Sequence, residues 1–497
     1  MKVIKKIYVF ILAAVLLTVA GCEKEFLDTR PTDKITTDQM FETYDGALAA
    51  LNGTYRLFYA FGIEGWTGHS DFGQKAVDLT MDLMGDDMPI ASQGYNWFIA
   101  EYGYNQHSAT KAWPQYLWNL YYNLVNNANN IIANVDKVEA TTEEVNYVKG
   151  QALTIRAYAY FYLVRLFQHT YVGHENDPGV PIYTAPTSEG KARASVQEVY
   201  TQIENDLTDA ITMLGNTFSR IHISHINQDV AEGIMARVKL TKEEWSDAVS
   251  YAQDARSGGY PLMDSTTYHY AINGQSGFNH VSTSEWMWGF QINSEQSTIY
   301  ASFFSHFDPT FMTYAFLGLQ KQMNSATYAM IDNPSGDVRA QNFDVTGGET
   351  GVPYCQLKFL SYDQATFMGD YLMMRSSEMH LIEAEAQAHI PGNEALAQQA
   401  IYDLVSTRDG SYTMPTATGQ ALLDEIWFQR RIELWGEGFR LLDIKRRKQP
   451  LDRTGGNHQP ALAREMTLPA ESDLFIFQIP EEELDANDNI NQEDQNP

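Results

Sequence analysis

Aromatic rings set among glycine and amide side chains are the residues of this sequence best suited to binding a ligand. Trp66 lies in the glycine-flanked segment 65–68, and Tyr95, Asn96 and Trp97 follow one another in the segment 94–98. An aromatic face stacks on the C–H face of a sugar, while amides and carboxylates hydrogen-bond to its hydroxyl groups. These segments therefore predict a sugar site. The alternative for each ring is that it packs its own loop onto the rest of the fold.

Other aromatic residues are predicted to belong to the core. Trp286, Trp288 and Phe290 alternate along a strand-like segment, so they share one face of a strand. Trp118 and Tyr122 recur at helical spacing. Both groups fit packing better than ligand contact.

Residues that carry catalysis or hold metal ions form no recognisable pattern. The sequence lacks the phosphate-loop, dinucleotide, nucleophile-elbow and zinc-protease motifs. His222 and His225 have no Cys or carboxylate at a ligand-like spacing, which favours a surface or helix-capping pair over a metal site. Cys355 stands alone and is expected to be a small core residue. We therefore expect a binding protein with no cofactor and no metal, and neither a glycosidase nor another enzyme.

The charge of the chain limits its partners. Its 497 residues include 34 Lys and Arg against 63 Asp and Glu, a formal net charge of −29. Proteins that bind nucleic acids gain most of their affinity from basic surfaces. Nucleic acid is therefore not an expected partner.

The N-terminus has the features of an export signal. Lys2, Lys5 and Lys6 precede a mainly apolar run of 14 residues, 7–20, and Cys22 follows the small residues Ala20 and Gly21. The run is too short for a permanent membrane span. The segment resembles a bacterial lipoprotein signal, in which the Cys becomes the acylated first residue of the mature protein. We expect a signal peptide over 1–21 and a lipid-anchored tether over 22–36, with the lipid on Cys22 as the only membrane attachment; an ordinary cleaved signal peptide is the alternative.

Hydrophobic periodicity after the tether predicts a mainly helical protein. Apolar residues recur at steps of three and four from about residue 37 to Tyr55, which indicates a first helix. Further helices are predicted over 113–135, 143–167, 195–214, 226–240, 242–255, 371–389, 394–407 and 419–434. The short connections at 240–242 and 390–393 predict helical hairpins.

Two long segments interrupt the helices. Residues 61–112 and 258–368 are rich in Gly, Ser, Asn, Thr and aromatic residues, and they are too long to be simple connections. We expect a mainly α scaffold of tetratricopeptide-like helical hairpins that carries large irregular loop insertions and short strands. Loops held on a rigid scaffold are where binding residues concentrate.

The C-terminal third resembles a known family. Residues 429–446, from Gln429 through Trp435 to Arg446, are similar to the signature segment of the RagB/SusD family of Bacteroidetes nutrient-uptake lipoproteins. Arg375 and Glu378 match the helix that precedes it, residues 477–487 resemble the family's closing segment, and residues 22–31 resemble its mature start. The likeness extends over nearly the whole chain.

This resemblance implies both a fold and a function. It implies about four tetratricopeptide-like helix pairs in a single domain over 37–497, on the outer membrane and facing the cell exterior. Such a protein packs on a SusC-like TonB-dependent transporter and acts as a lid that captures ligand for import. Most members bind oligosaccharides through aromatic rings in loops, and a minority serve peptide uptake, so a peptide- or protein-binding subunit remains the alternative.

The resemblance also implies roles for individual residues. Trp97 lies in the loop after Asp86 and Asp87, where members often place a stacking ring, so it is the leading ligand-binding residue. The remaining expected ligand contacts are Trp66, Tyr95 and Asn96, Asp71 as an acceptor for hydroxyl groups, and Tyr300 and Phe304 on a second side. The signature segment is expected to be structural. Its acidic and basic residues predict ion pairs that fix the last helix: Arg430, Arg431, Arg440, Glu433, Glu437 and Asp443.

Overall fold

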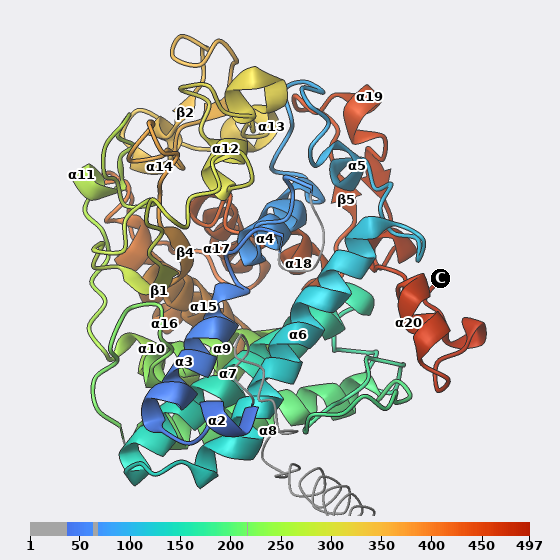
Figure 1. The fold of residues 1–497 in the computed structure, drawn as a ribbon. Helices are drawn as coiled ribbons and strands as arrows, with labels where there is room; N and C mark the ends of the chain where they lie inside the picture. Colours follow the sequence, from blue (N-terminus) through green and yellow to red (C-terminus); the bar gives the residue numbers. More distant parts are fainter. Residues whose placement is uncertain (1–36, 63–67, 216) are drawn as a thin grey trace, which may run out of the picture.

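Helices form the frame of the protein in a computed structural model that describes residues 37–62, 68–215 and 217–497 (Figure 1). The predicted signal peptide, Cys22 and the tether lie outside the described residues, and so does Trp66. In Figure 1 the helices between residues 142 and 256 occupy the lower half, and the short helices between residues 265 and 341 lie in the upper half. The chain thus separates a helical scaffold from its insertions.

The scaffold is a row of helices in which each packs on the next. Its members are α2 (Thr37–Met40), α3 (Tyr44–Arg56), α6 (Ala112–Asn134), α7 (Thr142–Phe167), α8 (Val196–Leu214), α9 (Gln228–Thr241), α10 (Trp245–Arg256), α15 (Ser376–His389), α16 (Glu394–Val405) and α17 (Gln420–Glu433). Consecutive helices from α6 to α10 pack together, then α10 packs on α15 and α15 on α16. The predicted hairpins α9–α10 and α15–α16 are confirmed, as is the mainly helical class.

Local sequence signals explain where the long helices begin. Thr141 and Glu144 form a capping box at the start of α7, and Ser195 and Glu198 form another at the start of α8. Each such cap satisfies backbone N–H groups that have no partner within the helix and contributes about 1 kcal/mol. Helix α7 is buried on nearly all sides, and its small residues Ala152 and Ala159 are fully buried. It is therefore the central helix of the scaffold.

Two predicted helices are divided in the structure. The segment predicted as one helix over 371–389 begins with strand β4 (Tyr371–Arg375), which pairs antiparallel with β1 (Trp286–Phe290), and only then continues as α15. A short run of apolar residues is compatible with both a buried strand and a buried helix. Hydrophobic periodicity therefore could not distinguish the two in this segment. The first predicted helix breaks between α2 and α3, where the Thr43 side chain accepts a hydrogen bond from the Gly46 N–H and starts a new helix.

The two insertions contain more regular structure than we predicted. Helix α4 (Gln74–Leu83) lies within 61–112, and all ten of its residues are buried, including the polar face formed by Gln74, Asp78 and Asp82. The other short elements are α5 (Ile99–Tyr102), α11 (Ser265–Tyr268), α12 (Phe303–Phe307), α13 (Ser325–Tyr328), α14 (Val338–Gln341), β2 (Phe343–Asp344) and β3 (Cys355–Gln356). After α17 follow α18 (Arg440–Arg446), β5 (Leu451–Asp452), α19 (Pro460–Ala463), β6 (Thr467–Leu468) and α20 (Glu481–Ala486).

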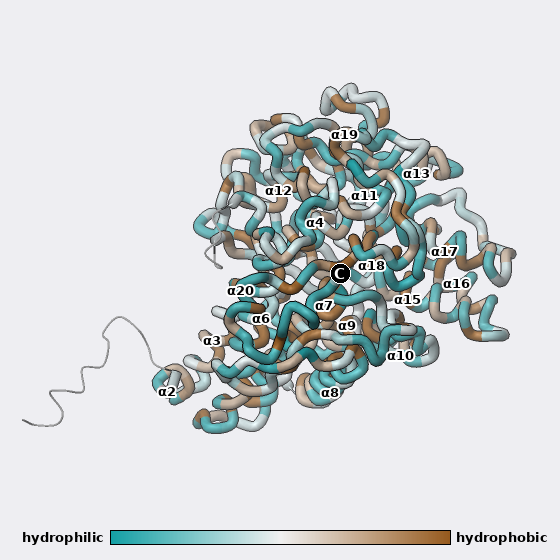
Figure 2. The backbone as a smooth tube through the Cα atoms, turned by 90° about the vertical axis from the view of Figure 1, so that its right-hand side faces the viewer, coloured by the Kyte–Doolittle hydropathy of each residue, from teal (hydrophilic) through white to brown (hydrophobic). Residues whose placement is uncertain are grey.

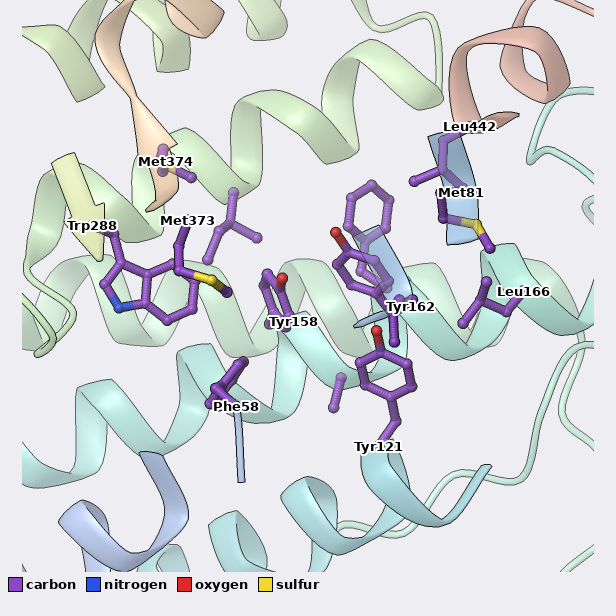
Figure 3. Packing of buried hydrophobic residues seen from close by; sticks show 14 of the residues in the cluster. Phe58, Met81, Tyr121, Tyr158, Tyr162, Leu166, Trp288, Met373, Met374 and Leu442 are labelled. Carbon is purple, nitrogen blue, oxygen red and sulfur yellow. The ribbon is translucent and has the colours of Figure 1, made fainter. Parts of the chain in front are cut away.

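The core lies between α7 and the sheet formed by β1 and β4. Trp288 of β1 and Tyr158 of α7 face each other and Phe58, with ring centroids 5.5–5.6 Å apart (Figure 3). Trp286 and Phe290 are also buried, which confirms the prediction that these rings belong to the core. Apolar and polar residues alternate along the helices (Figure 2), and within the described ranges no helix is both long and apolar enough to cross a bilayer.

Candidate functional site

Four aromatic rings from the two insertions gather on one surface. We name Tyr95, Trp97, Tyr300 and Tyr314 the aromatic platform. Tyr314 is its centre, with ring centroids 5.4 Å from Tyr95, 6.0 Å from Trp97 and 5.2 Å from Tyr300. Tyr95 is 59% exposed, Trp97 and Tyr300 are half-buried, and Tyr314 is buried beneath them. A buried ring thus supports three rings whose faces or edges reach the surface.

His69 fixes the orientation of two platform rings. Its imidazole stacks on Trp97 at a centroid distance of 5.5 Å and an interplanar angle of 19°. Its Nδ1 lies 2.6 Å from the hydroxyl oxygen of Tyr314. Burial raises the pKa of Tyr314, and a hydrogen bond from Trp97 offsets part of that rise. Trp97 is therefore held in place before any ligand arrives, which lowers the entropic cost of binding.

A short ladder of backbone hydrogen bonds joins the segments that carry the rings. The N–H of Gln322 donates to Pro89 O at 2.9 Å, the N–H of Ala91 to Gln320 O at 3.0 Å, and the N–H of Asn324 to Asp87 O at 3.0 Å. Residues 87–91 thus run beside residues 320–324. This pairing sets the spacing between the Tyr95–Trp97 loop and the Tyr314 segment.

Two glycines allow the loops to approach closely. Gly94 has φ of +44°, and a Cβ there would lie 2.7 Å from Leu319 Cγ. Gly318 has φ of +110°, and a Cβ there would lie 2.9 Å from Ser92 Oγ. Both positions combine a backbone conformation that L side chains rarely adopt with a contact too short for a side chain. The turns that present Tyr95 and Tyr314 therefore depend on glycine.

A neutral, apolar layer supports the platform from below. His306 is fully buried, stacks on Tyr314 at 5.2 Å, and places its Nε2 2.8 Å from His69 O. Burial lowers the pKa of His306 well below its usual value, so the imidazole stays uncharged. Phe72 and Phe98 pack against the same imidazole, at centroid distances of 5.3 and 4.9 Å. His306, Phe72 and Phe98 thus support the platform with uncharged rings.

The remaining predicted site residues take different positions. Asn96 is exposed in the turn between Tyr95 and Trp97, with φ of +68°, and its Oδ1 accepts a hydrogen bond from Gln93 Nε2 at 2.6 Å. Asp71 is buried, and its carboxylate accepts the N–H of Gly62 at 3.0 Å. Phe304 is 1% exposed and packs on Phe303 and Tyr371. Asp71 and Phe304 therefore lie in the interior, where they support loops and do not line the platform surface.

Sequence reasoning missed the centre of the platform. Neither Tyr314 nor His69 was singled out, because each gains its role only from the packing of the two insertions. A signal was present in the segment 311–316, which contains three aromatic residues and Met312. In the structure Met312 is 59% exposed and Phe316 45% exposed, so this segment adds apolar surface beside the platform.

The signature segment ties the first insertion to the scaffold. Arg431 pairs with Asp87 at 2.6 Å and Arg440 with Asp86 at 2.5 Å, directly before the platform loop. The predicted ion pair within the segment is confirmed for Arg430 and Asp443, at 2.7 Å.

The two glutamates of the signature segment bind cations from other parts of the chain. Glu433 pairs with Arg375 and Arg408, and Glu437 with Arg375 and Lys358, at 2.5–3.1 Å. The segment is therefore structural, as predicted, but most of its ion pairs reach far beyond the last helix.

A second hollow is chemically different from the platform. It has a volume of about 400 Å³ and lies between residues 330–339, residues 405–412 and helix α17. Its lining includes five carboxylates against one arginine, Arg339: Asp332, Asp337, Asp409, Asp424 and Glu425. In the described part of the chain, no three His, Cys, Asp or Glu side chains are grouped to hold a metal ion. The gathered rings make the platform the stronger candidate for a ligand site.

Fold and site together define a helical scaffold protein that presents aromatic rings on inserted loops. A family profile described as "Starch-binding associating with outer membrane" matches residues 67–240, and the profile of the SusD family matches residues 242–497. The chain belongs to the SusD family. In general, proteins of this family bind carbohydrates at the outer-membrane surface and work with a SusC-type partner.

Curated relatives match part of the chain. SusD-like protein P2 of Formosa agariphila is 29% identical over 256 residues, which cover 50% of this chain and 46% of that protein. SusD-like protein P25 of the same organism is 22% identical over 246 residues, or 48% and 43% of the two chains. The matched region thus spans less than half the length of either relative.

Solved structures match nearly the whole chain. The crystal structure of a SusD-like carbohydrate binding protein from Bacteroides vulgatus has a TM-score of 0.79 and 27% identity, covering 91% of this chain and 98% of that one. A laminarin binding SusD-like protein has a TM-score of 0.67 and 19% identity, covering 92% and 100%. This second likeness concerns the fold alone. The predicted family and fold class are both confirmed.

Proposed function

We propose that this protein binds oligosaccharides on the aromatic platform at the cell surface and acts as a lid for a SusC-like TonB-dependent transporter. The observation that carries the proposal is the gathering of Tyr95, Trp97 and Tyr300 around the buried Tyr314. Rings held on a rigid base suit the flat C–H faces of sugars. The carbohydrate-binding protein of similar fold from Bacteroides vulgatus supports the same assignment.

The size of the platform predicts modest affinity. Two or three stacking rings each add about 0.5–1.5 kcal/mol to the contribution of the area they bury, and together we expect a Kd of about 10 μM to 1 mM. Modest affinity suits a protein that releases its ligand to a transporter. We propose that the protein has no catalytic activity and needs no cofactor, since stacking and hydrogen bonding suffice for this role.

The membrane arrangement follows from the N-terminus and the family. We propose that residues 1–21 are removed, that Cys22 carries the lipid anchor and that 22–36 tether the single domain, 37–497, to the outer membrane, facing the exterior. Tethering to the same membrane as the transporter raises the effective concentration of the two partners to roughly millimolar. A partly polar interface is then sufficient for a stable complex.

A binding panel with matched variants tests the proposal. The soluble chain is titrated with neutral and acidic oligosaccharides and with peptides, and the best ligand is then measured on Trp97→Ala. We expect about tenfold weaker binding, because removal of a central stacking ring costs 1–2 kcal/mol or more. Trp245→Ala is the control, since Trp245 is also half-buried but stacks on His389 of the scaffold, 4.0 Å away.

The control separates loss of binding from loss of folding. If both variants unfold at similar temperatures and only Trp97→Ala loses sugar binding, the platform is the site. Equal binding by Trp97→Ala and the unmodified chain would contradict it. A panel in which only peptides bind would replace the sugar by the alternative, a peptide- or protein-binding subunit.

A further inference from the structure

A small cavity among the helices has more cationic than anionic side chains in its lining. Its volume is about 30 Å³, and it lies where the ends of α7 and α9 meet α17 and α18. Five cationic side chains line it: Arg165, Arg237, Arg430, Lys445 and Arg446. Asp443 is the one carboxylate among the lining residues of this cavity.

The ion pairs around this cavity leave positive charge unmatched. Arg237 pairs with Glu378 at 2.6 Å, Arg446 with Glu385 at 2.6 Å, and Arg430 with Asp443 at 2.7 Å. These three pairs account for three of the five basic side chains and leave Arg165 and Lys445 without a carboxylate partner in the described part of the chain. Among the residues that the structure describes, no carboxylate lies within ion-pair distance of Arg165 or Lys445.

The two unmatched cations are held there by other contacts. The Lys445 ammonium donates hydrogen bonds to the carbonyls of Arg165, Gln168 and Phe475. Arg165 lies over the ring of Phe161, 3.6 Å from its centroid. Burial, together with the nearby Arg165 cation, lowers the pKa of Lys445 to about 7. A negative charge nearby would favour the protonated ammonium form of Lys445.

Two buried hydrogen-bonding groups at the cavity have no partner. Thr170 is 3% exposed and Arg430 is 4% exposed. Neither Thr170 Oγ1 nor Arg430 Nη1 makes a hydrogen bond within the described chain. Buried polar groups almost always have a partner, and leaving one without costs about 1–3 kcal/mol. The cavity is large enough for a bound species of about the size of a water molecule.

A neighbouring cavity gives a useful contrast. Arg430 also lines a space of about 10 Å³ beside Arg440, whose Nη1 is unpartnered as well. There the three arginines of the lining are matched by three aspartates, so the charges balance and a water molecule suffices. The excess of positive charge distinguishes the larger cavity.

We propose that the larger cavity binds a chloride ion, or another monovalent anion of that size, beside the hydroxyl of Thr170. The anion supplies the missing acceptor and offsets part of the excess positive charge. It joins α7, α9 and the signature segment through α18, so its role is to stabilise their junction. A space of about 30 Å³ suits a small anion.

Thermal unfolding in two salts tests the proposal on the purified chain. Sodium chloride is compared with sodium gluconate at the same ionic strength, so that screening of surface charges is equal. We expect the unfolding midpoint to be about 1–3 °C higher in chloride, as a ligand that binds only the folded state requires. In crystals grown with bromide, an anomalous scattering peak is expected at the cavity, beside Thr170.

Two threonine variants make the test specific. Thr170→Val removes the unpartnered hydroxyl and should lose most of the difference between the salts. Thr241→Val is the control, because Thr241 lines the same cavity but its hydroxyl already donates to Arg237 O at 2.9 Å; it should keep the difference. Equal midpoints in chloride and gluconate for the unmodified chain would overturn the proposal. So would a Thr170→Val variant that keeps the full difference, which is the result expected if water fills the cavity.

Discussion

Replacing Glu433 by Gln should cost far more stability than replacing an exposed carboxylate. The Glu433 carboxylate is fully buried and lies 2.5 Å from Arg375 Nη1 and 3.1 Å from Arg408 Nη2. Although burial raises its pKa, the guanidinium groups of Arg408 and Arg375 hold the pKa of Glu433 well below the usual range. Glu433→Gln keeps the shape of the side chain and removes its charge.

The partners of Glu433 determine the size of the loss. Arg375 keeps Glu285 and Glu437, but Arg408 keeps only Glu285, which it shares with Arg375. One positive charge of the cluster is then left without compensation in the interior. Breaking a buried pair in this way costs about 3–5 kcal/mol, whereas an exposed pair contributes about 1 kcal/mol or less.

Equilibrium unfolding by denaturant at pH 7 measures the difference. Asp136→Asn is the matched control, because Asp136 pairs with Lys149 at 2.5 Å but its side chain is 59% exposed. Because folding lowers the pKa of Glu433, its contribution to the free energy of unfolding is fully present above about pH 4.5, its ordinary pKa. That contribution is lost as the pH falls through the pKa of Glu433 in the folded protein. The reasoning is refuted if the two variants lose the same free energy of unfolding, or if Glu433→Gln loses less than about 1 kcal/mol.

Three further predictions concern other parts of the molecule. Burial raises the pKa of Glu101 to about 7, so the stability of the unmodified chain relative to Glu101→Gln should fall as the pH rises from 5 to 8; parallel pH profiles of the two unfolding midpoints would contradict this. Cys22→Ala should move the protein from the membrane fraction to the soluble fraction in cells that lack the transporter; retention in the membrane would exclude the lipid as the sole anchor. Gly94→Ala should weaken sugar binding more than Gly259→Ala, which has the same sign of φ but nothing within 4 Å of the added Cβ; equal binding by both would argue against the close packing of the platform loop.

The parts of the fold that local sequence determines were predictable. Helices α7 and α8 begin at capping boxes and α9 and α10 are joined by a short turn, so their positions follow from neighbouring residues. Helix α4 was missed although its polar residues recur at helical spacing, because it lies within a segment whose composition indicated an irregular insertion. Strand β4 was predicted as helix because only its pairing with β1, far away in the sequence, distinguishes the two.

The candidate site was predictable only in part. Tyr95 and Trp97 were found because they stand among glycine and amide residues, and the structure brings them together with Tyr300. Tyr314 and His69 were not found, because their roles depend on a ladder between segments more than two hundred residues apart. Asp71 and Phe304 show the opposite error: their residue types fit a sugar site, but neighbouring groups bury them. The sequence shows which aromatic residues could bind a ligand, but tertiary packing determines which of them are exposed to it.

The ion pair between Asp86 and Arg440 affects the order in which parts of the chain can fold during synthesis. Its two members are 354 residues apart, so the carboxylate leaves the ribosome long before its partner. Until the last quarter of the chain is available, burying Asp86 and Asp87 would leave two uncompensated charges, which is strongly unfavourable. The loop that follows Asp87 therefore cannot adopt its final structure early, although N-terminal segments usually fold first during synthesis. A chain truncated before Arg431 would expose its aromatic rings without a defined arrangement, so premature termination should yield an aggregation-prone product and not a smaller folded protein.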